Sequence, residues 1–305
     1  MNRNPAFYPF LVTLVAIGLL SLMDGFMKSA ALTIGAYSAL LVRSGMALAL
    51  VGPVWAWQGA PWPPRPALRL HLIRGVIASF MALTFFSALV YLPLAEAIAL
   101  SFISPIVALA LAALILKETI AGKTIVAALL GLVGVAIIVA GRIGQHAMSD
   151  EAALGVILVL VSALLYAWNL ILQRQQALVA KPVEIAVFQN GIVGLVMLLG
   201  APFFFTMPDV PATWGAIFAT AVLGVSGGLM LAWAYARAEA QVLVPVEYSG
   251  FAWAALFGWL FFAESLEPAT TAGALLIIVG CWIAAPRKHT EQVATEAGPH
   301  TRAEP

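Results

Sequence analysis

The stretch FYPFLVTLVAIGLLSLMDGFM, residues 7–27, decides the class of fold. It is almost entirely apolar and long enough to cross the ~30 Å hydrocarbon layer of a bilayer as a helix. Nine similar stretches follow it, and they are continuous rather than alternating with period two, which favours helices over a barrel. The sequence therefore predicts an all-α membrane protein with ten transmembrane helices. The predicted spans are 7–27, 36–57, 72–92, 94–116, 124–141, 154–172, 183–205, 214–236, 242–262 and 269–285.

The composition excludes several classes of protein. Of the 305 residues, 63% are hydrophobic and only 10% are charged, whereas soluble domains carry ~25% charged residues. The net charge of +1, without a basic run interleaved with aromatic residues, predicts no nucleic-acid partner. The single cysteine, Cys281, lies in the last apolar stretch and supports neither a disulfide framework nor a thiol metal site. Membrane lipid and a small-molecule substrate are the expected partners, and no feature points to an obligatory protein partner.

Signatures of an enzyme are missing from the sequence. It has no phosphate-binding glycine loop with its lysine and no nucleophile elbow. The four histidines, the first of which is His71, are all expected in loops or in the tail. We therefore predict no catalytic function, no metal and no cofactor.

The positive charges predict the orientation. The stretch 7–27 is longer than the apolar region of a secretory signal and carries Asp24, so we expect it to be retained as the first span. With a cytoplasmic N-terminus, only Lys28 and Arg142 fall outside and Arg43 stays within a span. The sequence thus predicts a multi-pass protein of the bacterial inner membrane with both termini in the cytoplasm, including a disordered tail over 287–305. The inside set is Arg3, Arg65, Arg69, Arg74, Lys117, Lys123, Arg174, Lys181, Arg237, Arg287, Lys288 and Arg302.

An internal repeat organises the chain. Glu264 lies 146 positions after Glu118, and other polar and glycine residues match at the same offset without a gap. Each copy holds five spans, an odd number, so the second copy must enter the membrane from the opposite side. We predict one repeat over 1–146 and an inverted repeat over 147–286, around a central cavity as in secondary transporters. The further matches are Thr124 with Thr270, Gly134 with Gly280, Gly45 with Gly191 and Ala88 with Ala234.

The pattern within each copy resembles a known family. A span that ends in Glu, a short loop and a span with glycine runs from Ser104-Pro105 through Leu116-Lys117-Glu118 to Gly131-Leu132-Val133-Gly134, and recurs from Gly250-Phe251 through Phe261-Phe262-Ala263-Glu264 to Ile278-Val279-Gly280. Doubled in ten spans, it resembles the EamA-type domain of the drug/metabolite transporter superfamily over nearly the whole chain except its tail. The resemblance implies a transporter of small polar metabolites, often an exporter of amino acids. It also implies a cavity lined mainly by the third, fourth, eighth and ninth spans, with the first and sixth nearby.

Ionisable side chains inside spans are candidate functional groups, because each costs about 2.5–3.5 kcal/mol to insert. Asp24 and Arg43 lie at matching depths and predict a pair. Asn169 and Asn190 stand next to the positions that lie 146 residues after Asp24 and Arg43. They predict that the second repeat carries an equivalent girdle of polar side chains, which is neutral where that of the first repeat is charged. Clamping of neighbouring helices and a gating or substrate role both remain open for these four residues.

Two prolines mark further candidate sites. Glu247 follows Pro245, and carbonyls freed by the proline beside a carboxylate could bind an ammonium group or a proton; alternatively, Glu247 reaches cytoplasmic water or Arg237. Pro105 lies in the fourth span, and a break there would leave a carbonyl for a ligand, or would only shape packing. Candidate polar contacts beside it are Ser101 and Ser104.

Aromatic residues at the expected depth of the cavity could stack on a substrate or hold an ammonium over a ring, although Trp and Tyr near span ends also serve as interface anchors. These candidates are Phe86, Trp168, Trp233, Tyr248 and Trp253. Glu118 and Glu264 favour a capping role at helix ends, and glycines in the fifth and tenth spans favour close helix contacts. Those glycines are Gly131, Gly134, Gly273 and Gly280.

These observations predict a secondary transporter that moves a small metabolite by alternating access, and in particular an exporter of amino acids. The chain has no ATP-binding motif, so flux follows a gradient, with proton coupling and facilitated diffusion both open. The segment YLPLAEA, residues 91–97, is similar to members that import cofactor-like metabolites such as riboflavin or an adenosyl compound. Import of such a compound is therefore the alternative.

Overall fold

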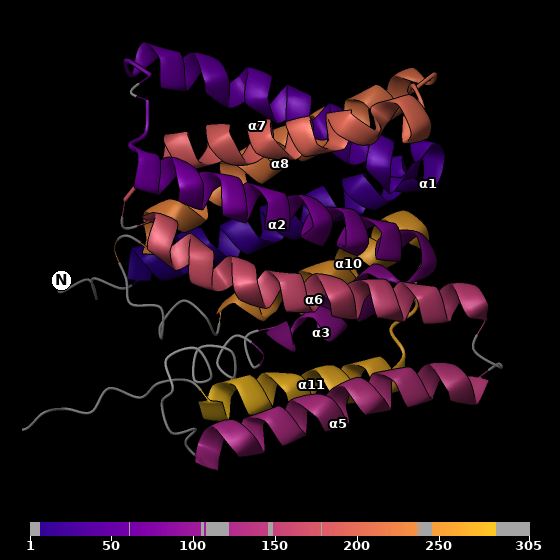
Figure 1. Cartoon of the computed structure of the whole chain (residues 1–305). Helices are drawn as coiled ribbons and strands as arrows, with labels where there is room; N and C mark the ends of the chain where they lie inside the picture. The colour runs from indigo at the N-terminus through magenta and orange to yellow at the C-terminus, as the bar shows by residue number, and fades with distance from the viewer. Residues whose placement is uncertain are drawn as a thin grey trace, which may run out of the picture.

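A computed structural model describes residues 7–60, 62–104, 107, 122–145, 149–177, 179–235, 237 and 246–284. Within these ranges the regular structure is entirely helical, as expected for continuous apolar runs in lipid. The described helices are α1 (Phe7–Trp57), α2 (Arg65–Tyr91), α3 (Leu94–Ser101), α5 (Gly122–Gln145), α6 (Asp150–Ala177), α7 (Pro182–Phe204), α8 (Pro211–Tyr235), α10 (Ser249–Phe262) and α11 (Pro268–Ala284) (Figure 1).

The longest element, α1, contains a turn. Its 51 residues would measure about 77 Å as a straight helix, far more than a bilayer. Gly35 interrupts it with φ 80° and ψ 150°, a conformation that suits glycine because it has no Cβ. The chain then runs back toward the end where α1 began (Figure 1). The predicted loop at 28–35 is thus helical except at Gly35, and we name the two ends of the bundle the Phe7 end and the Gly35 end.

Five of the described helices are long and apolar enough to cross a membrane by length and composition. They include α1 as a single element, so the ten-span count remains a prediction, whereas the all-helical membrane class is confirmed. The five segments are Tyr8–Trp57, Arg65–Tyr91, Asp150–Gln173, Pro182–Phe204 and Pro211–Ala234.

The fourth predicted span, 94–116, is described only in part. Its helix α3 ends at Ser101, with Phe102 as its C-cap. A proline clashes with the carbonyl four residues before it, and Pro105 stands four residues after Ser101. The end of α3 therefore agrees with a break near Pro105, although Pro105 itself lies outside the described residues.

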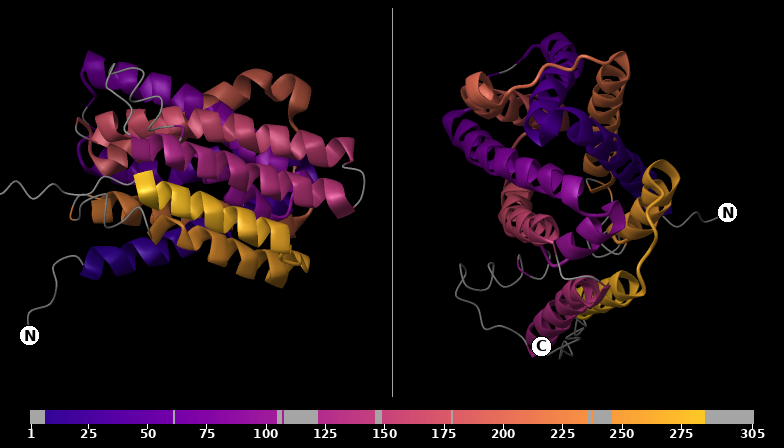
Figure 2. Two further views of the ribbon diagram at one scale, coloured as in Figure 1. Left: turned by 90° about the horizontal axis from the view of Figure 1, so that it is seen from below. Right: turned by 90° about the vertical axis from the view of Figure 1, so that its right-hand side faces the viewer.

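The helices pack in a pattern that maps onto itself when the two halves of the chain are exchanged. The most extensive contacts are those of α1 with α8, α5 with α11 and α2 with α6, and α3 also packs against α10. If each helix is replaced by its counterpart in the other half of the chain, the pair of α2 and α6 becomes the pair of α8 and α1. The pair of α3 and α10 and the pair of α5 and α11 each stay the same. The first helices of the two halves, α1 and α6, also begin at opposite ends of the bundle (Figures 1 and 2). This is the arrangement expected of two inverted repeats.

Close contact between α5 and α11 depends on glycine. A Cβ at Gly134 would lie 2.6 Å from the Gly273 carbonyl oxygen, and a Cβ at Gly273 would lie 2.5 Å from the Gly134 carbonyl oxygen. The two helices run side by side at one edge of the bundle (Figure 2). The predicted role of these two glycines in helix packing is confirmed; for Gly131 and Gly280 it remains a prediction.

Candidate functional site

The charges of Asp24 and Arg43 lie in the middle of the bundle. Asp24 is ten residues, about 15 Å of helix, before Ile34, and Arg43 is eight residues, about 12 Å, after Gly35. Both side chains are half-buried, and their charges act on each other. Among the described residues, however, the ion pairs within 4.0 Å join other groups. The predicted pair is thus a longer-range attraction rather than a contact.

Among the described residues, the Arg43 guanidinium meets weak partners. Its Nη2 donates to the Met23 sulfur at 3.2 Å, and its Cζ lies 5.8 Å from the centre of the buried Phe86 ring. Its Nε is buried without a hydrogen-bond acceptor in the part of the chain that the structure describes. A Cβ at Gly224 of α8 would lie 2.6 Å from Nη2, so this glycine gives the guanidinium its room.

A polar network toward the Phe7 end joins α2 to α6. Arg74, only 5% exposed, donates from Nε to Asn169 Oδ1 at 3.0 Å and from Nη2 to Gln173 Oε1 at 3.3 Å. Its Nη1 donates to Gln176 Oε1. One buried guanidinium thus engages three amide side chains on successive turns of α6, which ties the two helices together. Of the predicted girdle, Asn169 belongs to this network.

The network continues to α7 through His71. Gln176 bonds to His71 Nδ1, and His71 Nε2 lies 3.0 Å from Glu184 Oε1. The ring also stacks on Phe188 with 4.7 Å between centroids. The expectation that every histidine lies in a loop or the tail is therefore wrong for His71, which lies within α2. The reason is that α2 begins at Arg65, seven residues before the predicted span.

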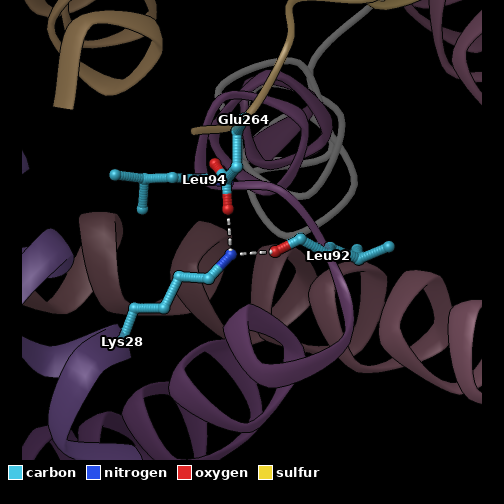
Figure 3. A network of polar contacts seen from close by, with 4 residues as sticks. All are labelled: Lys28, Leu92, Leu94 and Glu264. Carbon is cyan, nitrogen blue, oxygen red and sulfur yellow. Dashed lines mark hydrogen bonds and ion pairs between the residues drawn. The ribbon is translucent and has the colours of Figure 1, made fainter. Parts of the chain in front are cut away.

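A second polar network lies toward the Gly35 end (Figure 3). Lys28 Nζ donates to the Leu92 carbonyl at 2.6 Å and pairs with Glu264 Oε1. The other carboxylate oxygen accepts from the backbone N–H of Leu94 at 2.8 Å. Leu94 is the first residue of α3, so Glu264 binds an N–H that the helix itself leaves unpaired, at its positive end.

The contacts of this network test the sequence predictions for Glu264 and Lys28. The helix-end role expected for Glu264 is confirmed, although the helix that it caps belongs to the other half of the chain. The expectation that Lys28 lies in an outside loop is wrong, because α1 continues past it to Gly35 and buries the side chain. Glu118, the repeat partner of Glu264, lies outside the described residues.

The backbone after α10 positions Glu264. Ala263 adopts a left-handed conformation with φ 51°, and its N–H donates to the Trp259 carbonyl at 3.1 Å. The N–H of Glu264 donates to the Gly258 carbonyl at 3.1 Å. A left-handed residue whose N–H bonds to the carbonyl four residues earlier is the αL type of helix end. It turns the carboxylate toward α3 and Lys28 (Figure 3).

The other predicted residues of the ninth span lie near α1, α3 and α6. Tyr248 is buried, with its ring edge-on to Phe102 at 5.1 Å. Glu247 is half-buried, and its charge acts on Tyr166 of α6. Trp253 covers Gly18 of α1, where an added Cβ would lie 3.2 Å from the indole. Pro245 lies outside the described residues.

The remaining candidates are either exposed or bond to nearby residues of their own chain segment. Trp168 and Trp233 are 44% and 38% exposed. Ser101 and Asn190 bond to carbonyls one turn earlier in their own helices, at 2.8 Å and 2.9 Å, and the buried Ser104 bonds to the Ser101 carbonyl. Roles of these residues in substrate binding or gating remain predictions.

Comparison with known proteins identifies the family. The model of the EamA-like transporter family matches this chain twice, over residues 8–140 and 153–285. The chain belongs to the EamA-like transporter family. The two matches cover both halves of the chain, as the repeat requires.

Relatives agree with this assignment. The pseudopaline exporter CntI of Pseudomonas aeruginosa is 27% identical over 274 residues, which cover 89% of this chain and 93% of that protein. An uncharacterized transporter of Helicobacter pylori is 28% identical over 220 residues, 70% of this chain and 72% of that protein. A solved crystal structure superimposes with a TM-score of 0.63 at 20% identity, over 91% of this chain and 96% of the other, and shows the shared fold. The chain is thus a multi-pass membrane transporter rather than an enzyme.

Proposed function

We propose that this protein is a secondary transporter of the bacterial inner membrane that exports amino acids by alternating access. The observation that carries export is the relation to an exporter along 93% of that protein's length. Mid-membrane charges on α1 support a small polar cargo, because ionisable groups inside a membrane protein are costly and mark substrate or ion pathways.

Alternating access requires that the two ends of the bundle open in turn, with the substrate site near the midplane. The Lys28–Glu264 network ties α1, the start of α3 and the end of α10 together at the Gly35 end. The Arg74 network ties α2 to α6 on the other side of Asp24 and Arg43. In the proposed cycle, each network breaks when its own end opens and holds while the other end is open.

Import of a cofactor-like metabolite is less well supported. The import alternative rests on the similarity of the segment 91–97 to importers of such compounds. In the structure, Lys28 binds the backbone of Leu92 and Glu264 binds the backbone of Leu94. That segment thus has a structural task at the Gly35 end, which explains its polar connections without a cofactor. We therefore favour export.

The test is flux through the purified protein in proteoliposomes. Vesicles loaded with the twenty standard amino acids should lose one or more of them faster than protein-free vesicles, and repetition with a pH gradient separates proton coupling from facilitated diffusion. The absence of flux for every amino acid would contradict the substrate class. Uptake of riboflavin or an adenosyl compound in its place would favour the alternative.

A further inference from the structure

We propose that Asp24 and Arg43 together form a dipolar binding site that takes the ammonium group and the carboxylate of a zwitterionic substrate. This inference rests on the proposed function and specifies the chemistry of its cargo. The carboxylate would bind to Arg43 and the ammonium to Asp24, both contributed by the two passes of α1.

The first support is the unused capacity of Arg43. A guanidinium carries five N–H donors in a planar fork that matches a carboxylate with two parallel hydrogen bonds. The Nη2 contact is to the Met23 thioether, a weak acceptor, and the Nε is buried without an acceptor among the described residues. Buried donors are nearly always satisfied, and an unsatisfied one is costly. A substrate carboxylate would supply the missing acceptor.

The second support is the state of Asp24. In the described part of the chain the ion pairs within 4.0 Å join other residues, and no hydrogen bond reaches the Asp24 carboxylate. Because Asp24 and Arg43 carry opposite charges and do not contact each other, both groups are available to a ligand that has a positive and a negative end. A zwitterion between them would replace one distant attraction by two contact ion pairs.

The third support is position. Both residues lie about half of a ~30 Å hydrocarbon layer from the turn at Gly35, which is the depth where secondary transporters bind their substrates. The Lys28–Glu264 network lies closer to the Gly35 end, and the Arg74 network lies toward the Phe7 end. The site thus stands between the two networks proposed to open in turn.

The experiment compares three related probes in the proteoliposome assay. The amino acid that the protein moves fastest is compared with the amine that lacks its carboxylate and with the carboxylic acid that lacks its amino group. We expect the zwitterion to move about tenfold to a hundredfold faster than either, the range for loss of one hydrogen bond to a charged group.

Two variants then assign the ends. Arg43→Gln should abolish the preference for the amino acid over the amine, and Asp24→Asn should abolish its preference over the carboxylic acid. The matched control is Arg69→Gln, an exposed residue of α2, which should leave all three rates unchanged. A purely structural role would lower all rates together without a change in their ratios, and that result would overturn the proposed site.

The comparison of the three probes on the wild-type protein tests the proposal even if the variants do not fold. If the amine and the acid move as fast as the amino acid, the dipolar site is wrong while the exporter proposal stands. If no amino acid moves at all, both proposals fall.

Discussion

At the scale of single residues, the buried charges at the Gly35 end are stabilised by complete pairing. Removing Lys28 and Glu264 from water is costly, and such a pair is tolerated only when further hydrogen bonds satisfy both groups. Lys28 meets a carboxylate and the Leu92 carbonyl, and Glu264 uses one oxygen for Lys28 and the other for the Leu94 N–H. Loss of either partner would leave a buried charge alone.

Replacement of Glu264 tests this pairing. Glu264→Gln should lower the free energy of unfolding by about 3–5 kcal/mol, because it strands the Lys28 ammonium in the protein interior. The measurement is denaturant unfolding in mixed micelles. The control Glu151→Gln, at an exposed carboxylate of α6, should change stability by less than about 0.5 kcal/mol. Removal of both charges in Lys28→Met with Glu264→Gln should recover much of the loss, and failure to recover any would contradict the pairing.

The Arg74 network depends on the shape of its side chain as much as on its charge. Arg74→Lys keeps the positive charge but cannot reach three amides from one planar group. Because buried acceptors on α6 lose their donors, we expect a loss of about 1–3 kcal/mol in unfolding free energy. Arg69→Lys, on the same helix but exposed, is the matched control. Equal stability of the two variants would show that charge alone suffices.

Some of these residues could be found from the sequence and others could not. Asp24, Arg43 and Glu264 stand out because they are charged residues within or directly after an apolar run. Hydropathy places the ends of spans at the first charges, so it assigns Lys28 to an aqueous loop and counts Arg74 only among the cytoplasmic charges. Their burial depends on partners from distant helices, which one-dimensional hydropathy does not contain.

At the scale of elements, the helices resemble the predicted spans where apolar character alone sets their limits. The described α7 and α11 each begin and end within one residue of the expected 183–205 and 269–285. At α2 the helix begins seven residues before the predicted span, right after Pro64, and the added residues include His71, which binds α6 and α7. Such extensions follow from tertiary hydrogen bonds rather than from the hydropathy of the helix itself.

The contact between α5 and α11 supplies a prediction at this scale. In Gly134→Ala the new methyl would meet the Gly273 carbonyl, a backbone atom that cannot turn aside, so the helices must separate. We expect a loss of about 1–3 kcal/mol in unfolding free energy. The matched control is Gly228→Ala in α8, where nothing lies within 4 Å of the added Cβ. It should be neutral or slightly stabilising, since alanine favours helix. Similar losses in both variants would argue against the close contact.

At the scale of the whole molecule, the repeat in the sequence anticipates how helices from different halves meet. The offset of 146 residues identifies equivalent spans, and the contacts of α2 with α6 and of α1 with α8 obey that equivalence. The sequence could not show which spans touch across the halves. It also could not show that Glu264 caps a helix of the other half, because the offset relates equivalent positions and not contacting ones.

Topology gives the last prediction. The connections that hold Trp62 and Val179 lie at the Phe7 end, and those that hold Met207 and Leu266 lie at the Gly35 end (Figure 1). All four side chains are exposed, so cysteine at each position should react with a maleimide that cannot cross membranes when it reaches that side. With Cys281 replaced by Ala, labelling of intact spheroplasts should reach positions 207 and 266 only, because positive charge holds the Phe7 end in the cytoplasm. Inverted vesicles should give the opposite result. Labelling of 62 and 207 from the same side would rule out this arrangement of helices, whereas exchange of the two pairs would reverse only the orientation.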